Sequence, residues 1–248
     1  MNQDTQTTQE ATPHRFSRVE LLLGADRLAQ LQAATVMVLG LGGVGGSCAV
    51  ALARGGVGTL ILLDRDTVEI TNINRQAVAY TSTIDCVKAD VMCDLVYEIN
   101  PDCQVYADQV ELTQTNIADV FSRYPRPDYV IDCIDMVGAK VHVAVHCQDA
   151  GLPLIAAMGA GNKLDPTQLT FADIYQTKNC NLSRTMRREY KKAGIQQLDV
   201  IFSTELPVKI QNPASAARQH TLGTMSYMPP IMGEMLASQV IRHLVGLS

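Results

Sequence analysis

The sequence has no tryptophan, few aromatic residues and no large excess of charge of either sign. Twenty lysine and arginine residues stand against 25 aspartate and glutamate residues, so the formal net charge is −5 at pH 7. Such a chain has no global positive field that would attract a polyanion. Any contact with a nucleic acid must therefore come from a local basic patch.

The cysteines lack the spacing that a disulfide framework or a structural zinc site needs. All seven stand singly, and none belongs to a CxxC pair. Secreted disulfide-rich domains are small and dense in cysteine, and tetrahedral zinc sites use closely spaced pairs. We therefore expect a reducing, cytoplasmic compartment.

Long hydrophobic runs are also missing. The first residues are polar and lack the apolar stretch of a signal peptide, so we interpret residues 1–14 as a flexible tail. The apolar segment IMGEMLASQVIRHLVGL near the C-terminus is interrupted by four polar or charged side chains. It predicts a packed amphipathic helix with no obligate membrane partner, and it leaves peripheral contact with a membrane open.

Up to residue 158, apolar runs of strand length alternate with segments of helical periodicity. Strands are expected at 35–40, 59–64, 103–110, 128–134 and 152–158, and helices at 44–56 and 83–100. Nearly continuous apolar strands with helices between them are typical of a parallel sheet that is covered on both faces. The pattern therefore predicts an α/β fold, a Rossmann-like, mostly parallel sheet with helices on both faces.

The alternation of strands and helices changes after residue 158. Strands are expected at 168–175 and 199–205, with a basic helix at 181–194 between them, then a loop at 207–221 and the final helix. We interpret residues 15–158 as the nucleotide-binding region and 159–248 as a C-terminal α+β elaboration for the substrate. Both belong to one continuous domain.

A glycine-rich turn, GLGGVGG, joins the first strand to the first helix. Gly40, Gly42 and Gly45 form the pattern G-x-G-x-x-G, which lets backbone N–H groups approach a phosphate at a helix N-terminus. Asp64 ends the second strand, where an acidic side chain hydrogen-bonds ribose hydroxyls. These features suit NAD and ATP equally well.

The loop that follows, DRDTVEITNINRQ, favours ATP. Arg75 offers a bidentate fork for phosphate, and Lys88 adds a compact positive charge. A triphosphate needs this neutralisation as pyrophosphate leaves, whereas a nicotinamide cofactor does not. The further polar side chains expected at the nucleotide are Asp66, Asn72, Asn74 and Gln76.

Two carboxylates stand at the end of the fourth strand, in DCIDMVGAK. Strand ends of an open α/β sheet face the ligand crevice, and a carboxylate there can hold Mg²⁺ against phosphate oxygens. We interpret Asp135 as the metal ligand. Asp132 is left as a capping or supporting residue.

Three other features have alternative interpretations. His142 and His146 share a helix face, but no acidic or cysteine companion is near, which favours ordinary helix residues. Cys180 is either a nucleophile or sulfur carrier, or a residue without a chemical role. The basic helix is either a contact for a phosphate backbone or a solvated face, and its cationic residues are Arg184, Arg187, Arg188, Lys191 and Lys192.

The glycine turn, Asp64, TNINRQ, Lys88 and DCID together resemble the ubiquitin-activating-type (ThiF/MoeB-like) adenylyltransferase superfamily. Within it, the chain is similar to the tRNA threonylcarbamoyladenosine dehydratases from about residue 15 to residue 247. RFSRVELLLG, MGAGNKLDPTQ, ADIY and VIFSTELP carry this similarity. The CxxC zinc pairs and the catalytic cysteine loop of the sulfur-carrier enzymes are not found.

The resemblance implies an activity. ATP with Mg²⁺ would adenylate the threonyl carboxylate of N6-threonylcarbamoyladenosine beside the tRNA anticodon, and intramolecular ring closure to the oxazolone would release AMP. The backbone at Gly42 and Gly43 would hold phosphate, and Asp64 would hold ribose. Asn72, Arg75, Lys88 and, across a homodimer, Arg18 would stabilise the phosphate charge.

The resemblance also implies a monovalent cation, Na⁺ or K⁺, and leaves a sulfur-relay protein partner open. Three other functions stay open at this point. They are activation of the C-terminus of a ubiquitin-like sulfur-carrier protein, nicotinamide-dependent oxidoreduction, and non-catalytic binding of tRNA or a partner.

Overall fold

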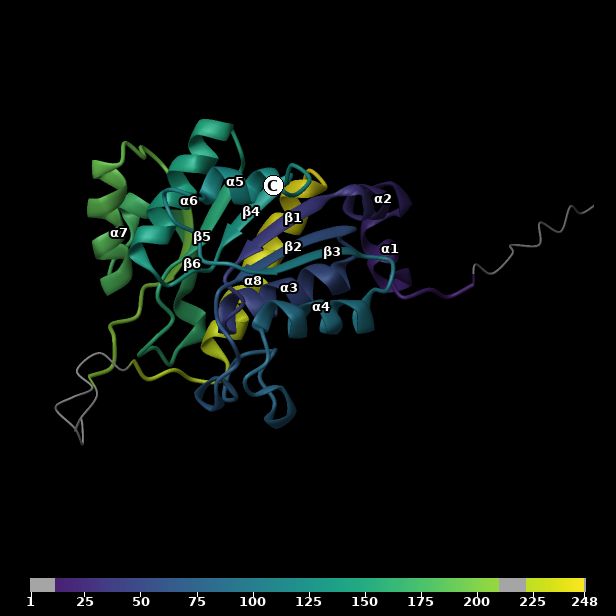
Figure 1. Ribbon diagram of the computed structural model, residues 1–248, viewed down its shortest axis with the longest axis horizontal. Coiled ribbons are helices and arrows are strands. Elements are labelled where there is room, and N and C mark those ends of the chain that lie inside the picture. The colour runs from purple at the N-terminus through teal and green to yellow at the C-terminus, as the bar shows by residue number, and fades with distance from the viewer. Residues whose placement is uncertain (1–11, 210–221, 248) are drawn as a thin grey trace, which may run out of the picture.

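Within residues 12–209 and 222–247, which this computed structural model describes, seven strands form one sheet (Figure 1). The strands are β1 (Thr35–Leu39), β2 (Thr59–Asp64), β3 (Gln104–Gln109), β4 (Tyr129–Asp132), β5 (Leu154–Ala157), β6 (Leu169–Asp173) and β7 (Asp199–Ser203). Their order is β3-β2-β1-β4-β5-β7-β6, and every neighbouring pair is parallel except β6 with β7. The predicted mostly parallel sheet is confirmed.

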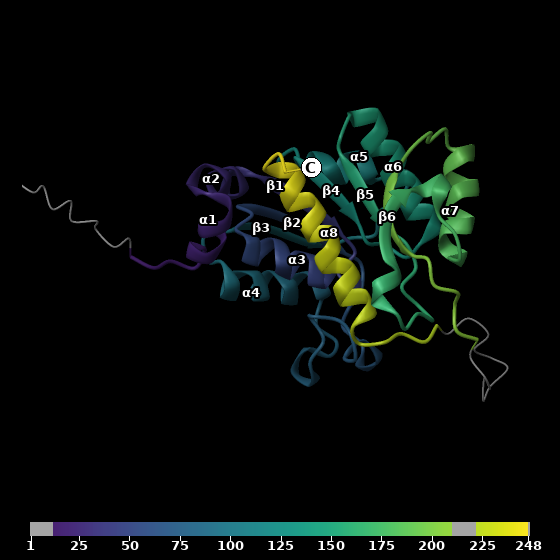
Figure 2. The same cartoon turned by 180° about the vertical axis from the view of Figure 1, so that it is seen from behind.

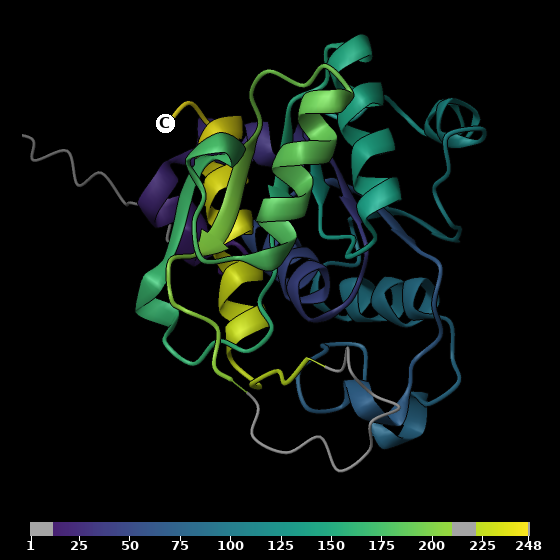
Figure 3. The same ribbon diagram turned by 90° about the vertical axis from the view of Figure 1, so that its left-hand side faces the viewer.

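Helices cover both faces of this sheet, as Figure 3 shows from its edge. They are α1 (Ser17–Leu23), α2 (Ala25–Ala33), α3 (Gly43–Gly55), α4 (Lys88–Ile99), α5 (Ile117–Ser122), α6 (Val137–Ala150), α7 (Asn181–Lys192) and α8 (Met228–Leu244). Apolar side chains of α3, α4 and α8 form the core on one face. Those of α5, α6 and α7 form the core on the other.

The central strand β1 shows why helices must pack on both faces of the sheet. Val36 and Val38 point into the core beside α3 and α8, whereas Met37 and Leu39 point into the core beside α5 and α6. All four side chains are fully buried. Because side chains alternate along a strand, a continuous apolar run fits only a strand that is buried on both sides.

Helix α4 begins five residues later than the sequence predicted. The backbone N–H of Val68 donates to the carbonyl of Cys86, and Asp85 adopts a left-handed φ of 68°. Residues 84–87 therefore pair with the loop that follows β2 instead of coiling into the helix. The consequence is that Lys88 stands in the first turn of α4, close to that loop.

The final helix α8 crosses α3 at short range (Figure 2). A Cβ on Gly233 would lie 2.1 Å from the carbonyl oxygen of Val44, so only glycine permits this contact. Three apolar side chains further along α8 or next to Gly233 are fully buried: Met232, Leu236 and Val240. None of the helices in the described ranges is long and apolar enough to cross a bilayer.

Helices α1 and α2 form an arm that the sequence pattern did not predict. Phe16 is buried against Leu28 and the backbone at Gly56, which anchors the arm near the amino ends of the strands. Leu21 and Leu22 are 78% and 86% exposed. Most of the predicted tail and most of the 207–221 loop lie outside the described residues, and the division of the chain at residue 158 stays a prediction.

Candidate nucleotide-binding site

The glycine turn lies at the carboxyl end of β1 and leads into α3, which begins at Gly43. A Cβ at Gly45 would lie 1.8 Å from the carbonyl oxygen of Gly40, so the backbones touch and no side chain fits. Gly40 has a φ of 84° and packs against the backbone of Cys133 beyond β4. The turn is therefore fixed by backbone contacts, with its N–H groups at a helix N-terminus.

One side of the turn is open. A Cβ at Gly42 would meet only the Gln76 amide nitrogen, at 3.8 Å. Gln76 is 9% exposed, and its Oε1 is buried without a hydrogen-bond partner among the described residues. A buried amide oxygen without a partner is costly, which makes this side chain a candidate to bond a ligand or a water at the turn.

Asp64 is buried at the end of β2 and is bonded directly to the turn. One carboxylate oxygen accepts from the backbone N–H of Leu41, and the other accepts from the N–H of Asp66 at 2.8 Å. Each oxygen has a second lone pair. Asp64 thus holds the turn and can still accept a hydrogen bond from a ribose hydroxyl.

Three side chains of the loop after β2 are held by hydrogen bonds to backbone groups or to one another. Asn72 is buried and accepts from the backbone N–H of Glu69 at 3.1 Å, and the amide of Asn74 donates to the carbonyl of Thr224 at 2.9 Å. Arg75 donates through Nη1 to the Asn74 side chain at 2.8 Å. Because this bond uses only one nitrogen of the Arg75 guanidinium, the rest of the guanidinium is available to a phosphate.

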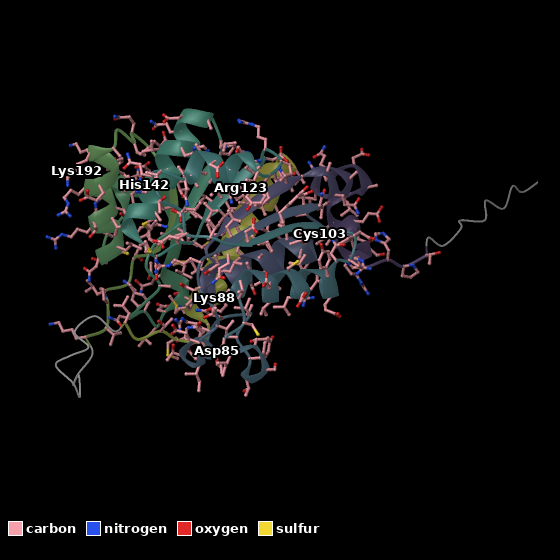
Figure 4. The ribbon with its side chains drawn as sticks, viewed as in Figure 1. Asp85, Lys88, Cys103, Arg123, His142 and Lys192 are labelled. Atoms are coloured by element: carbon pink, nitrogen blue, oxygen red, sulfur yellow. The ribbon has the colours of Figure 1, made fainter. Side chains whose placement is uncertain are left out.

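Lys88 reaches the same loop from the first turn of α4 (Figure 4). It is buried, and its ammonium lies 3.2 Å from the Asp66 carboxylate, which also lies 3.3 Å from Arg65. We predicted Asp66 as a cofactor-binding residue. In the structure, its carboxylate pairs with Lys88, and its contact with a cofactor stays a prediction.

Asp132 and Asp135 occupy different environments at the end of β4. Asp132 is completely buried, and its carboxylate pairs with the Lys140 ammonium at 3.0 Å and accepts from the backbone N–H of Ile134 at 3.0 Å. Burial raises the pKa of Asp132, and Lys140 opposes that rise. Asp132 therefore supports the loop, whereas the Asp135 side chain is exposed on it.

The donor set agrees with the implied Mg²⁺. Within the described residues, no three His, Cys, Asp or Glu side chains gather as a metal cage. Magnesium is usually held by one or two carboxylates together with substrate phosphates and water, so one exposed carboxylate near a phosphate turn fits it.

Several predicted residues lie away from the turn. Arg18 is exposed on α1, in the arm near the amino ends of the strands. Figure 4 shows Lys192 and His142 at the opposite end of the molecule from that arm. The ring of His146 packs on Phe121 with a centroid distance of 4.4 Å, and Cys180 is buried and accepts the N–H of Ser183 at 3.4 Å. That bond caps α7.

The five cations of α7 are not equivalent. Arg187 donates to the carbonyl and hydroxyl of Thr177 at 2.8 and 2.6 Å. Arg188 and Lys192 pair with Glu189. Arg184 and Lys191 are exposed and form no ion pair within the described part of the chain.

Two buried lysines were not identified from the sequence. Lys140 and Lys163 are both nearly or fully inaccessible, and each bonds backbone carbonyl groups of loops at the carboxyl edge of the sheet. Lysine is seldom buried without a partner. Both lysines lie in segments that the sequence interpretation uses, DCIDMVGAK and MGAGNKLDPTQ, but neither segment indicates that its lysine is buried.

The sequence model of the ThiF family matches residues 16–248. The chain belongs to the ThiF family. A curated relative of this ThiF chain is the tRNA threonylcarbamoyladenosine dehydratase of Bacillus subtilis (strain 168), 38% identical over 243 residues, with 94% of this chain and 95% of the relative covered.

Two crystal structures of the Escherichia coli tRNA N6-threonylcarbamoyladenosine dehydratase, TcdA, are also similar to this ThiF chain. The complex with ATP has a TM-score of 0.84 at 32% identity, and the complex with AMP has a TM-score of 0.85 at 31% identity. Each comparison covers 94% of both chains. The resemblance to the ThiF-type dehydratases is confirmed.

Proposed function

We propose that this chain is an ATP-dependent tRNA threonylcarbamoyladenosine dehydratase that works by forming an acyl-adenylate. The observation that carries the proposal is the open side of the glycine turn, where a Cβ on Gly42 would meet only the amide nitrogen of Gln76 and the amide oxygen of Gln76 has no hydrogen-bond partner among the described residues. Arg75 lies beside Gly43 of the same turn, and Lys88 pairs with Asp66 in the loop that follows Asp64. This arrangement suits a nucleotide whose phosphates are to be cleaved, and the similarity to the ATP-bound relative over 94% of the chain supports it.

In the first step, a carboxylate oxygen of the threonyl group attacks the α-phosphorus of ATP. An oxygen–phosphorus bond forms, and the bond to the β-phosphate breaks with release of pyrophosphate. The turn N–H groups bind phosphate, Asp64 binds ribose, and Arg75 and Lys88 stabilise the negative charge that develops. Asp135 would hold Mg²⁺, whose charge would add to this neutralisation of the triphosphate.

In the second step, the carbamoyl group of the same side chain attacks the activated carbonyl. The ring closes, the carbonyl–oxygen bond to AMP breaks, and the attacking group loses a proton, so the overall loss from the nucleoside is one water. The reaction is intramolecular. Its catalysis therefore depends largely on holding the side chain in a reactive geometry.

The tRNA would approach across the elaboration that follows β5. Helix α7 is the proposed contact, and Arg184 and Lys191 are its two cations that form no ion pair within the described ranges. Arg18, on the opposite arm, would act on the nucleotide of a second copy in a homodimer. A monovalent cation, a cytoplasmic location and a sulfur-relay partner remain predictions from the resemblance and the composition.

The decisive experiment is mass analysis of tRNA nucleosides after incubation with ATP. We expect the hypermodified adenosine to lose the mass of one water, with one AMP formed for each product. Arg75→Ala should abolish most of this turnover, and Arg123→Ala, which removes the exposed arginine at the C-terminal cap of α5, is the matched control (Figure 4). AMP formation that ignores tRNA and requires a small sulfur-carrier protein would replace the proposal with the carrier-activation alternative.

A further inference from the structure

Three segments, one after β5, one that leads into α7 and one after β7, meet around the side chain of Lys163. We call 159–165, 177–181 and 204–208 the three-loop junction. Lys163 is 2% exposed, and its ammonium donates to the carbonyl oxygen of Asn179 at 3.0 Å and to that of Glu205. One charged group thus bonds the main chain of the other two loops.

Other bonds in the junction run between the same loops. The Glu205 carboxylate accepts from the backbone N–H groups of Leu164 at 2.9 Å and Asp165 at 3.0 Å. The Asn179 amide donates to the carbonyl of Thr204 at 2.7 Å. Each loop is therefore tied to another by bonds that fix backbone position, and Lys163 is the group that joins all three.

The coordination of the ammonium resembles that of an ion. Backbone carbonyl oxygens are the ligands that replace the hydration shell of a potassium ion in proteins, and an ammonium group is a compact positive charge. Taking that charge out of water is costly. Burial lowers the pKa of Lys163, in keeping with that cost. An apolar side chain would fill this space without the cost of burying a charge.

The place of the junction links it to the substrate. Segments 159–165 and 204–208 follow the carboxyl ends of β5 and β7, the edge at which an open α/β sheet binds ligands. Segment 177–181 leads directly into α7, with Cys180 as its cap. The orientation of α7 therefore depends on where the Asn179 backbone is held.

We propose that Lys163 is a positioning residue that serves as a built-in monovalent cation, holding the three-loop junction so that α7 and the loop after β5 face the substrate. The expected effect on tRNA turnover rests on the proposed function. The expected effect on the conformation of the three-loop junction is independent of it. Removing the ammonium while leaving its space open should create a site that a free cation of similar size can fill.

Two variants distinguish charge from volume. Lys163→Ala opens the space, whereas Lys163→Met fills it without a charge. Lys178→Ala, which removes an exposed lysine of the same junction, is the control. Amide hydrogen exchange of 159–165, 177–181 and 204–208 is followed in potassium, ammonium or tetramethylammonium chloride at equal ionic strength. The KM values for tRNA and ATP are measured in the same salts.

In tetramethylammonium chloride, both Lys163 variants should exchange faster than the wild type in all three segments. Potassium or ammonium should restore Lys163→Ala but not Lys163→Met. Since bonds to charged groups contribute about 1.5–3 kcal/mol, the KM for tRNA should rise about tenfold or more, with the KM for ATP little changed. If Lys163→Ala is unfolded in tetramethylammonium, recovery of its circular dichroism by potassium supports the proposal equally.

Three results would overturn it. One is a Lys163→Ala variant that exchanges like Lys178→Ala in every salt. Another is a loss of protection or of folding that neither potassium nor ammonium reverses. The third is equal rescue of the Ala and Met variants. A wild type that shows no tRNA-dependent turnover would refute the proposed function instead, and the exchange and rescue data would still decide the role of Lys163.

Discussion

Replacement of Lys140 by methionine tests how the loop that carries Asp135 is supported. The Lys140 ammonium pairs with the Asp132 carboxylate at 3.0 Å and donates to the carbonyl of Ile134 at 3.0 Å, and both charged side chains are completely inaccessible. Methionine keeps most of the volume and removes the charge. Asp132 would then be a buried carboxylate with one backbone N–H donor and no counter-ion.

Loss of one partner from a buried ion pair costs about 3–5 kcal/mol. For a chain of this size, 1 kcal/mol shifts Tm by about 2–4 °C, so Tm should fall by roughly 6–20 °C near neutral pH. The deficit should depend on pH. Burial raises the pKa of Asp132 and Lys140 opposes that rise, so the variant should have a higher Asp132 pKa than the wild type.

The sign of the pH effect follows from that direction. In Lys140→Met, the folded-state pKa of Asp132 lies above its unfolded value, so folding takes up a proton. The stability associated with the neutral carboxyl is fully present below the unfolded pKa and is lost as pH rises through the folded pKa. The variant should therefore differ least from the wild type in mild acid and most at neutral pH and above.

Urea unfolding of four proteins measures this: wild type, Lys140→Met, Asp132→Asn and the double variant, each at several pH values. The double variant should be more stable than Lys140→Met at neutral pH, because it leaves no buried charge without a counter-ion. A Lys140→Met variant within about 1 kcal/mol of the wild type would refute this reasoning. So would a deficit that does not change with pH.

Three further predictions concern the turn, the thiols and the basic helix. Gly45→Ala should abolish ATP binding in isothermal titration and destabilise the fold, because its Cβ would lie 1.8 Å from the Gly40 carbonyl oxygen. Gly42→Ala should keep the free energy of unfolding within about 1 kcal/mol of the wild type. Equal stabilities of the two variants would contradict this. At pH 8, Cys86 should react fastest with a disulfide reagent because it is exposed, and Cys86→Ser should remove that phase. Burial raises the pKa of Cys103 to about 11 and those of Cys133 and Cys147 to about 12, so these three should stay unreactive until urea is added. Lys191→Ala should weaken tRNA binding and lower its salt dependence by about one unit of slope without loss of Tm. Arg187→Ala should also lower Tm because it breaks two bonds to Thr177, and anisotropy titrations over a salt series with parallel melting curves would show whether the two variants differ.

The layered fold could be predicted because it depends on patterns that are continuous in sequence. The run Thr35–Leu39 reads as a buried strand since every core-facing position on both sides is apolar. The start of α4 could not be predicted. It depends on a backbone bond between Val68 and Cys86 and on the left-handed conformation of Asp85, neither of which leaves a mark on helical periodicity.

The candidate site was predictable to the extent that its residues follow a turn or a strand end. Asp64 and Arg75 do so, and the structure brings them to one edge of the sheet. The partners of these residues were not predictable. Nothing in the sequence indicated that Asp66 faces Lys88, or that Lys163 bonds the backbone of Glu205, 42 positions further along the chain.

Two of the buried lysines, Lys140 and Lys163, have the same physical role at neighbouring places. Lys140 bonds the loop after β4, and Lys163, in the loop after the adjacent strand β5, bonds the segment before α7 and the loop after β7. A buried ion pair is often no more stabilising than well-packed apolar side chains, so stability alone does not explain an ammonium in either place. Each ammonium instead bonds specific backbone oxygens, which restricts loop geometry more than apolar packing does. We infer that this edge of the sheet uses buried charge to hold loops in place, since an intramolecular ring closure gains most from precise orientation.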